Sequence, residues 1–158
     1  DLAYEYNVPI IIMHMLGKPS YMQQKPKYDN IIDDIKCFFE ERINYAVKIG
    51  CRKNQIILDP GIGFGKTVDD NDNIILNLNV FKDIGYPLLI GLSRKSFLSI
   101  NKDGPESRLP ATLGATVLAI QKGVDILRVH DIEATYKLKT ILQRITNNHP
   151  SMKEILYN

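Results

Sequence analysis

The segment around Asp59 combines a carboxylate, closely spaced glycines and a lysine in the string "ILDPGIGFGKT" at positions 57–67. This composition is typical of phosphate-binding loops. A Walker A loop requires a glycine where this chain has Pro60, which lacks a backbone N–H. The dinucleotide fingerprint requires a third glycine where this chain has Lys66. The segment is therefore predicted to be an apolar strand that delivers Asp59 into a turn of small residues.

Polar residues also follow three other apolar runs, in "MHM" (13–15), "GLSRKS" (91–96) and "RVHD" (128–131). Arg128 ends such a run, where a guanidinium is costly unless an anion or carboxylate pairs with it, so Arg128 and His130 form a plausible anion clamp. Ser93–Ser96 is predicted to open a helix, whose free N–H groups suit a carboxylate or phosphate. Lys95 could then reach a carbonyl or a ring nitrogen.

Each of these residues also has a purely structural interpretation. Asp59 could cap its turn, His14 could be a satisfied core histidine, and Ser93 could be only a helix N-cap. Solvent exposure is the simplest expectation for three further cations, Lys18, Lys66 and Arg108.

Four short apolar segments alternate with helical patterns, and these elements must position the polar residues. The predicted strands are 8–13, 55–58, 87–91 and 125–129. Helices are predicted at 30–49, 73–84, 110–122 and 132–145, with a short one from Arg94. Asp29 is expected to cap the first long helix and Gly50 to end it. Continuously apolar strands favour a parallel sheet, either a doubly wound open sheet or half of a (β/α)₈ barrel. Both architectures bind ligands at the carboxyl ends of their strands, where all four polar segments lie.

Composition narrows the function classes. The 158 residues are 44% hydrophobic and 24% charged with a net charge of +2, which gives no indication of nucleic-acid or membrane binding. The longest apolar run, 8–13, is too short to cross a bilayer. Two cysteines, Cys37 and Cys51, suggest neither a disulfide framework nor a zinc site, so a cytoplasmic location is expected. The first residue is Asp1 and residues 2–6 resemble the end of a helix, so we expect the chain to start partway through a larger protein.

Together, "MHMLGKPSYMQ", "LDPGIGFGK", "GLSRKSF" and "RVHD", in this order, resemble the dihydropteroate synthase family. The resemblance extends to about Ile145. It implies a (β/α)₈ TIM barrel, of which this chain covers about the last four βα units, with residues 1–158 forming the carboxyl-terminal part of a single pterin-binding domain. It also implies a transferase of folate biosynthesis, a sulfonamide target that condenses 6-hydroxymethyl-7,8-dihydropterin diphosphate with p-aminobenzoate to give dihydropteroate and diphosphate.

The resemblance also implies roles for individual residues. Catalysis is expected of Lys95, Arg128 and His130, and diphosphate binding of Arg128 and His130. The implied pterin-binding residues are Met13, Asp59, Phe64, Gly91, Lys95 and Arg128. Those implied for p-aminobenzoate are Gly63, Phe64, Arg94, Lys95 and Ser96. The glycines after Asp59 are interpreted as leaving room for the flat pterin, and Gly91 as leaving space beside it.

The family uses Mg²⁺, for which no ligand is expected in this chain, and the full-length enzyme is expected to be a homodimer. Other pterin ligands of the family lie on the first half of the barrel, so the isolated chain is not expected to be fully active. Three alternatives stay open: a metal-dependent hydrolase with His14, Asp59 and His130 as ligands, a pterin-binding methyltransferase that acts on a corrinoid, and a non-catalytic module.

Overall fold

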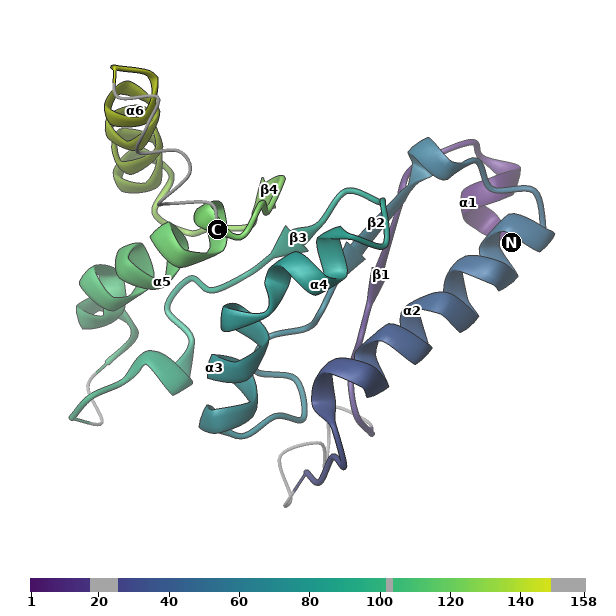
Figure 1. Cartoon of the computed structure of the whole chain (residues 1–158), viewed down its shortest axis with the longest axis horizontal. Helices are drawn as coiled ribbons and strands as arrows, with labels where there is room; N and C mark the ends of the chain where they lie inside the picture. The colour runs from purple at the N-terminus through teal and green to yellow at the C-terminus, as the bar shows by residue number, and fades with distance from the viewer. Residues whose placement is uncertain (18–25, 102–103, 149–158) are drawn as a thin grey trace.

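The computed structural model describes residues 1–17, 26–101 and 104–148 (Figure 1). The element order is α1 (Leu2–Glu5), β1 (Ile10–Met13), α2 (Ile31–Lys48), β2 (Ile56–Asp59), α3 (Val68–Leu76), α4 (Leu78–Lys82), β3 (Leu89–Ile90), α5 (Leu109–Gln121), β4 (Ile126–Leu127) and α6 (Ile132–Asn148). Short 3₁₀ turns cover Lys53–Gln55, Ser96–Leu98 and Pro105–Arg108. The predicted alternation of strands and helices is confirmed, although β3 and β4 are shorter than predicted.

The strands are parallel and neighbour one another in chain order. β1 pairs with β2 from Ile10↔Ile56 to Met13↔Asp59, and β3 pairs with β4. A parallel bridge between Leu58 and Leu88 joins the two pairs. A doubly wound sheet reverses its strand order at a switch point, and this sheet does not. Helices α2 to α5 lie on one side of the strands (Figure 1), so the architecture is half of a (β/α)₈ barrel.

Successive side chains of a strand point to opposite faces of the sheet, so each strand has a helix-facing side and an inner side. The helix-facing side chains of Ile12, Leu58 and Ile90 join the hydrophobic core together with Phe39 and Phe81 of the helices. On the inner side each strand contributes one apolar residue, namely Ile11, Ile57, Leu89 and Ile126. Two positions further toward the carboxyl end, each strand or the loop after it contributes Met13, Asp59, Gly91 and Arg128. These four are all predicted site residues.

The helix boundaries differ from the prediction in two places. Asn30, not Asp29, caps α2, because its side chain accepts hydrogen bonds from the N–H groups of Ile32 and Asp33. The helix predicted at 73–84 is two helices. The first, α3, begins five residues earlier than predicted, because Thr67 and Asp70 form a reciprocal capping box.

The predicted helix from Arg94 is wrong. Arg94 has a left-handed backbone with φ of 58°, and only the 3₁₀ turn Ser96–Leu98 follows before α5 begins at Leu109. A residue in this conformation cannot continue a helix. Ser93 therefore caps no helix, and the segment does not present the helix N-terminus that was expected to bind an anion.

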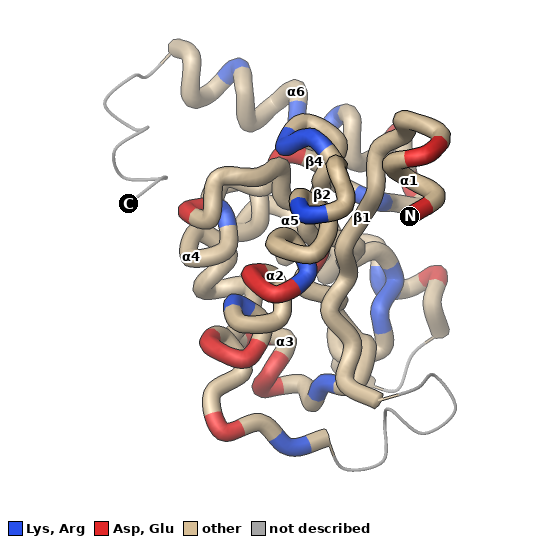
Figure 2. The backbone as a smooth tube through the Cα atoms, turned by 90° about the vertical axis from the view of Figure 1, so that its right-hand side faces the viewer, with Lys and Arg blue, Asp and Glu red and all other residues tan. Residues whose placement is uncertain are grey.

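Charged residues of both signs are interspersed along the backbone (Figure 2). Within the described ranges, no helix is long and apolar enough to cross a membrane.

Candidate active site

Asp59 lies at the carboxyl end of β2, and its side chain is only 5% exposed. Its Oδ1 accepts a hydrogen bond of 2.8 Å from the N–H of Gly61, so Asp59 does cap its turn. Burial raises the pKa of the carboxyl, while the Gly61 N–H and the positive charges of Arg128, Lys95 and Lys66 act in the opposite direction. The site is therefore centred on a buried acceptor with three cations close to it.

The glycine loop after Asp59 is packed tightly against the segment that follows β1. Gly61 and Gly65 have φ of +70° and +66°, a region that favours glycine. A Cβ on Gly61 would collide with the carbonyl oxygen of His14, and one on Gly65 would lie 2.7 Å from that of Leu16. Tyr28 adds a hydrogen bond of 2.8 Å from its hydroxyl to the Gly65 carbonyl. Backbone conformation and close packing thus require these glycines, which is a different reason from the predicted room for a flat ring.

Lys66 is buried, so the prediction that it is solvated is wrong. Its Nζ lies 3.1 Å from His14 Nδ1 and donates to the carbonyl oxygen of Phe64 at 3.1 Å. Burial lowers the pKa of Lys66 to about 8 and, together with the Lys66 charge, lowers the pKa of His14 to about 4. His14 is therefore a neutral core histidine, as its structural interpretation predicted, and Lys66 ties the glycine loop to β1.

Lys95 reaches back from the β3 loop to the glycine loop. Its Nζ lies 4.2 Å from the centre of the Phe64 ring, a cation–π contact. A Cβ on Gly63 would lie 3.5 Å from the same Nζ. Burial and the nearby Arg128 lower the pKa of Lys95, while Asp59 raises it. Lys95, Phe64 and Gly63 therefore form one wall beside Asp59.

Arg128 crosses the inner face above Gly91. A Cβ on Gly91 would lie 3.1 Å from the Arg128 guanidinium, so this glycine makes room for Arg128. A cavity of about 300 Å³ opens here, lined by Gly91, Ser93, Lys95, Arg128, Val129 and His130. Two side chains that can carry positive charge, Arg128 and Lys95, and the imidazole of His130 surround this space, which suits an anionic ligand.

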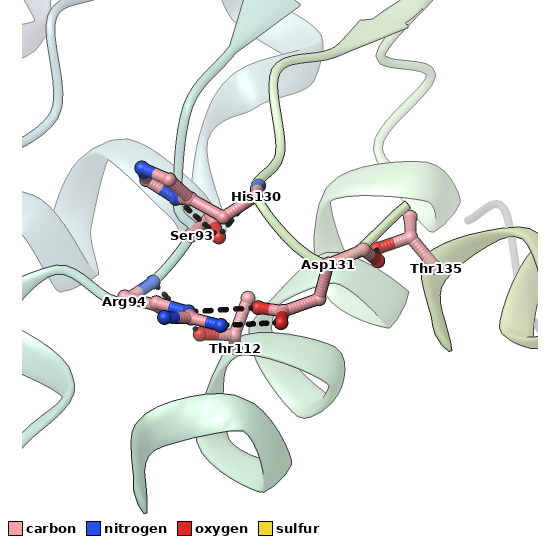
Figure 3. Close-up of polar contacts among 6 residues, drawn as sticks. All are labelled: Ser93, Arg94, Thr112, His130, Asp131 and Thr135. Carbon is pink, nitrogen blue, oxygen red and sulfur yellow. Dashed lines mark hydrogen bonds and ion pairs between the residues drawn. The ribbon is translucent and has the colours of Figure 1, made fainter. Parts of the chain in front are cut away.

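The loops after β3 and β4 are tied together by two adjacent pairs of side chains (Figure 3). Arg94 Nη2 and Nε donate to the two carboxylate oxygens of Asp131 at 2.6 and 3.0 Å. Ser93 Oγ accepts from the His130 backbone N–H at 3.1 Å and lies 2.9 Å from His130 Nδ1. This bidentate ion pair and this hydroxyl contact hold the two loops in register.

Not all of the predicted site residues face the cavity. Arg94 is directed toward Asp131, and Ser96 is exposed on its 3₁₀ turn. Arg108, predicted to be solvated, is half-buried and donates to the Arg94 carbonyl at 3.0 Å, so that prediction is wrong. Lys18 and the residues that follow it in the motif "MHMLGKPSYMQ" lie outside the described residues.

Sequence reasoning missed two residues that hold the site in place. Asn71 is buried in the first turns of α3, where its Oδ1 accepts from the Gly63 N–H at 2.8 Å. Thr112 of α5 accepts from the Arg94 N–H at 3.1 Å. A capping threonine before α3 was a visible signal that a helix begins beside the glycine loop, but no sequence pattern indicated the contact of Thr112.

A metal centre is not formed by the side chains that the structure describes. They include no group of three or more His, Cys, Asp or Glu residues placed to hold an ion. His14, the first ligand expected for a hydrolase, has its Nδ1 directed at Lys66, and Asp59 is surrounded by cations. His14 and Asp59 therefore do not converge on a common metal ion, as a metal-dependent hydrolase would require.

A separate cavity of about 420 Å³ lies between β4 and α6. Its lining includes Ile120, Leu127, Tyr136 and Leu142, and none of the predicted site residues. The chemistry-bearing side chains gather at the carboxyl ends of the strands, so that end of the sheet is the candidate active site.

Comparison with known proteins shows which family this chain is similar to. Residues 1–130 match the family of pterin-binding enzymes. The dihydropteroate synthase of Haemophilus influenzae is 40% identical over 148 residues, which are 93% of this chain and 54% of that protein.

Solved structures give the same result. The crystal structure of the Yersinia pestis dihydropteroate synthase with a sulfonamide drug has a TM-score of 0.89 at 35% identity, covering 92% of this chain and 54% of that one. The dihydropteroate synthase of Thermus thermophilus in complex with 4-aminobenzoate has a TM-score of 0.85 at 32% identity, covering 90% and 59%. The chain spans about half the length of the relatives it matches.

Proposed function

The chain belongs to the family of pterin-binding enzymes, and we propose that it forms the carboxyl-terminal half of the barrel of a dihydropteroate synthase. The proposed reaction joins 6-hydroxymethyl-7,8-dihydropterin diphosphate to p-aminobenzoate. The observation that carries this proposal is the buried carboxylate of Asp59 at the same edge of the sheet as Lys95, Arg128 and His130. One acceptor for a heterocycle and several donors for an anion then lie side by side.

Asp59 is proposed to bind the pterin ring. A buried carboxylate accepts strongly from a neighbouring pair of N–H donors, and the pterin offers its 2-amino group and N3–H. Met13 lies opposite Asp59 in the register of β1 and β2, where its thioether can pack on the ring. Arg128, above Gly91, is placed to cover the ring face.

The wall formed by Lys95, Phe64 and Gly63 is proposed to bind p-aminobenzoate. Phe64 offers an aromatic ring, and Lys95 contacts that ring and is close enough to Asp59 for the two charges to interact. Ser96 is exposed just beyond Lys95, where its hydroxyl can donate to the carboxylate. Arg94 is proposed to hold this segment through its ion pair with Asp131.

The chemistry follows from the charges around the cavity. The bond between the exocyclic methylene of the pterin and diphosphate breaks, and the dihydropterin ring stabilises the resulting cation. Arg128 and His130 stabilise the negative charge that develops on the departing diphosphate. The aromatic amine then forms the new C–N bond and loses a proton. No covalent enzyme intermediate is required.

The described residues do not form a binding site for Mg²⁺. Asp131 is paired with Arg94, and Asp59 is surrounded by cations that would repel the ion. None of the proposed steps therefore depends on a metal ion held by the described residues of this chain. The matched enzymes are about twice as long as this chain, and we propose that the remaining half of the barrel supplies further ligands. We also propose that the complete enzyme is a homodimer, which the exposed apolar side chains of Leu118, Ile132 and Tyr136 on α5 and α6 support.

Pterin binding tests the proposal at Asp59. Titration of the chain with 6-hydroxymethylpterin, followed by the fluorescence of the pterin, should give saturable binding that Asp59→Asn weakens by about tenfold or more, because hydrogen bonds to a charged acceptor are lost. Asp83→Asn, at the exposed carboxyl-terminal cap of α4, is the matched control and should leave the affinity unchanged. Equal affinities of the wild-type chain and Asp59→Asn would refute the proposed role of Asp59.

A corrinoid-dependent methyltransferase shares an acidic pterin pocket and is the second candidate. It has no need of the diphosphate-binding pair Arg128 and His130. Binding of inorganic diphosphate beside a bound pterin supports the synthase, whereas pterin binding without any diphosphate binding favours the methyltransferase.

A further inference from the structure

Ser93 makes two contacts with His130 that the proposed chemistry does not use. Ser93 is buried in the loop after β3, and His130 lies in the loop after β4. The serine oxygen accepts from the His130 backbone N–H at 3.1 Å and also lies 2.9 Å from Nδ1 of the same residue. One hydroxyl therefore contacts both the backbone and the ring of His130.

The hydroxyl group has a single proton to donate. Because Ser93 Oγ already accepts the backbone N–H, its own proton needs an acceptor, and His130 Nδ1 is the acceptor that the described residues offer. A neutral imidazole that accepts at Nδ1 carries its proton on Nε2. The opposite tautomer would leave the hydroxyl proton of a buried serine without an acceptor among these residues.

The second ring nitrogen of His130 points away from Ser93 (Figure 3). His130 lines the same cavity as Arg128 and Lys95. An N–H at Nε2 donates to an anion in that cavity, whereas an unprotonated Nε2 would turn a lone pair toward the negative charge. Which ring nitrogen carries the proton thus decides whether neutral His130 attracts or repels an anion in the cavity.

We propose that Ser93 is a positioning residue that holds neutral His130 in the Nε2–H tautomer and aims this N–H at the anion in the cavity. The identity of that anion as diphosphate rests on the proposed function. The tautomer itself does not, because it follows from the contacts of Ser93 alone.

The surroundings keep Ser93 and His130 in register. Arg94, next to Ser93, binds both carboxylate oxygens of Asp131, which is next to His130. The N–H of Arg94 is in turn held by Thr112 of α5. Two adjacent residues of one loop are thus paired with two adjacent residues of the other, which prevents His130 from sliding relative to Ser93.

The tautomer can be measured without any ligand. In the ¹⁵N-labelled chain at about pH 8, where an ordinary imidazole is neutral, NMR should show His130 with its proton on Nε2. The signal is identified by its absence in His130→Ala, since the chain has three histidines in all. A proton on Nδ1 of His130 in the wild-type chain would overturn the proposal, whatever the chain binds.

A double-mutant cycle with inorganic diphosphate tests the consequence. Ser93→Ala should weaken diphosphate binding by about tenfold when His130 is present and hardly at all in the His130→Ala background, because Ser93 acts through His130. The matched control is Thr140→Ala, which removes an exposed hydroxyl of α6 and should leave the affinity unchanged. Equal losses in both backgrounds would show a merely structural effect and overturn the proposal.

The two proposals fail in different ways. A chain that binds pterin and diphosphate but carries the His130 proton on Nδ1 refutes the role of Ser93 and leaves the proposed function intact. A folded chain that binds neither ligand refutes the proposed function, and the NMR spectrum then decides the tautomer by itself.

Discussion

Replacement of Gly61 by alanine tests the packing of the glycine loop most sharply. Gly61 combines a φ of +70° with a close approach to the segment after β1, where an added Cβ would meet the backbone carbonyl oxygen of His14 at well under 3.0 Å. Backbone cannot swing aside as a flexible side chain can. The N–H of Gly61 also binds the Asp59 carboxylate, so any shift of the loop is transmitted to the centre of the site.

The expected cost of Gly61→Ala is the sum of two effects. A left-handed backbone costs a non-glycine residue about 1–2 kcal/mol, and forcing an extra methyl group into packed surroundings costs about 1–3 kcal/mol. The free energy of unfolding should therefore fall by about 2–5 kcal/mol. Folded proteins have a total stability of only about 5–15 kcal/mol, so a loss of this size should be clearly visible as a lower melting temperature.

Gly114→Ala is the matched control, because it introduces the same methyl group at a position where we expect stability to rise and not to fall. Gly114 lies within helix α5, and nothing is within 4 Å of the position of its added Cβ. Alanine in a helix interior is favoured over glycine by about 0.5–1 kcal/mol, so this variant should be slightly stabilised. Urea unfolding of both variants is the assay. If Gly61→Ala loses no more stability than Gly114→Ala, the described packing of the loop is wrong.

Two further predictions concern the residues that hold this loop. The folded-state pKa of His14 is lowered from 6.5 to about 4, so between these pH values the unfolded chain binds more protons than the folded chain. The free energy of unfolding should therefore fall by about 2–3 kcal/mol as the pH drops from 6.5 to 4. Urea unfolding at a series of pH values should show that His14→Asn removes this loss, and an unchanged pH dependence would contradict the lowered pKa of His14. Asn71→Ala should cost about 2 kcal/mol in the same assay, because it deprives the Gly63 N–H and the Thr67 carbonyl of a buried partner, while the exposed Asn79→Ala should cost little.

The alternation of apolar segments and helical patterns was enough to predict the strands, the long helices and the end of the sheet at which the polar side chains gather. The order of the strands was not predictable from periodicity, because a doubly wound sheet and a half-barrel have the same local pattern. The parallel bridge from Leu58 to Leu88 distinguishes them, since it continues the chain order of the strands.

The failures of the prediction have local physical causes. Arg94 was placed in a helix because its neighbours suit a helix start, but its left-handed φ depends on contacts with Thr112 and Asp131, which are distant in sequence. Lys66 was expected in solvent because most lysines are, and the acceptors that make its burial tolerable, at His14 and Phe64, come from the fold. Sequence patterns report the character of a residue and not the partners that tertiary structure gives it.

Formation of dihydropteroate is the most direct test of the central claim. The chain should be joined to the amino-terminal half of the Haemophilus influenzae enzyme and supplied with the dihydropterin diphosphate, p-aminobenzoate and Mg²⁺. We expect product from this fusion, its loss in Asp59→Asn and Lys95→Ala, and its retention in Thr140→Ala. A folded fusion that makes no dihydropteroate, or one whose Asp59→Asn variant is as active as the parent, would contradict the claim that this chain carries the catalytic half of a dihydropteroate synthase.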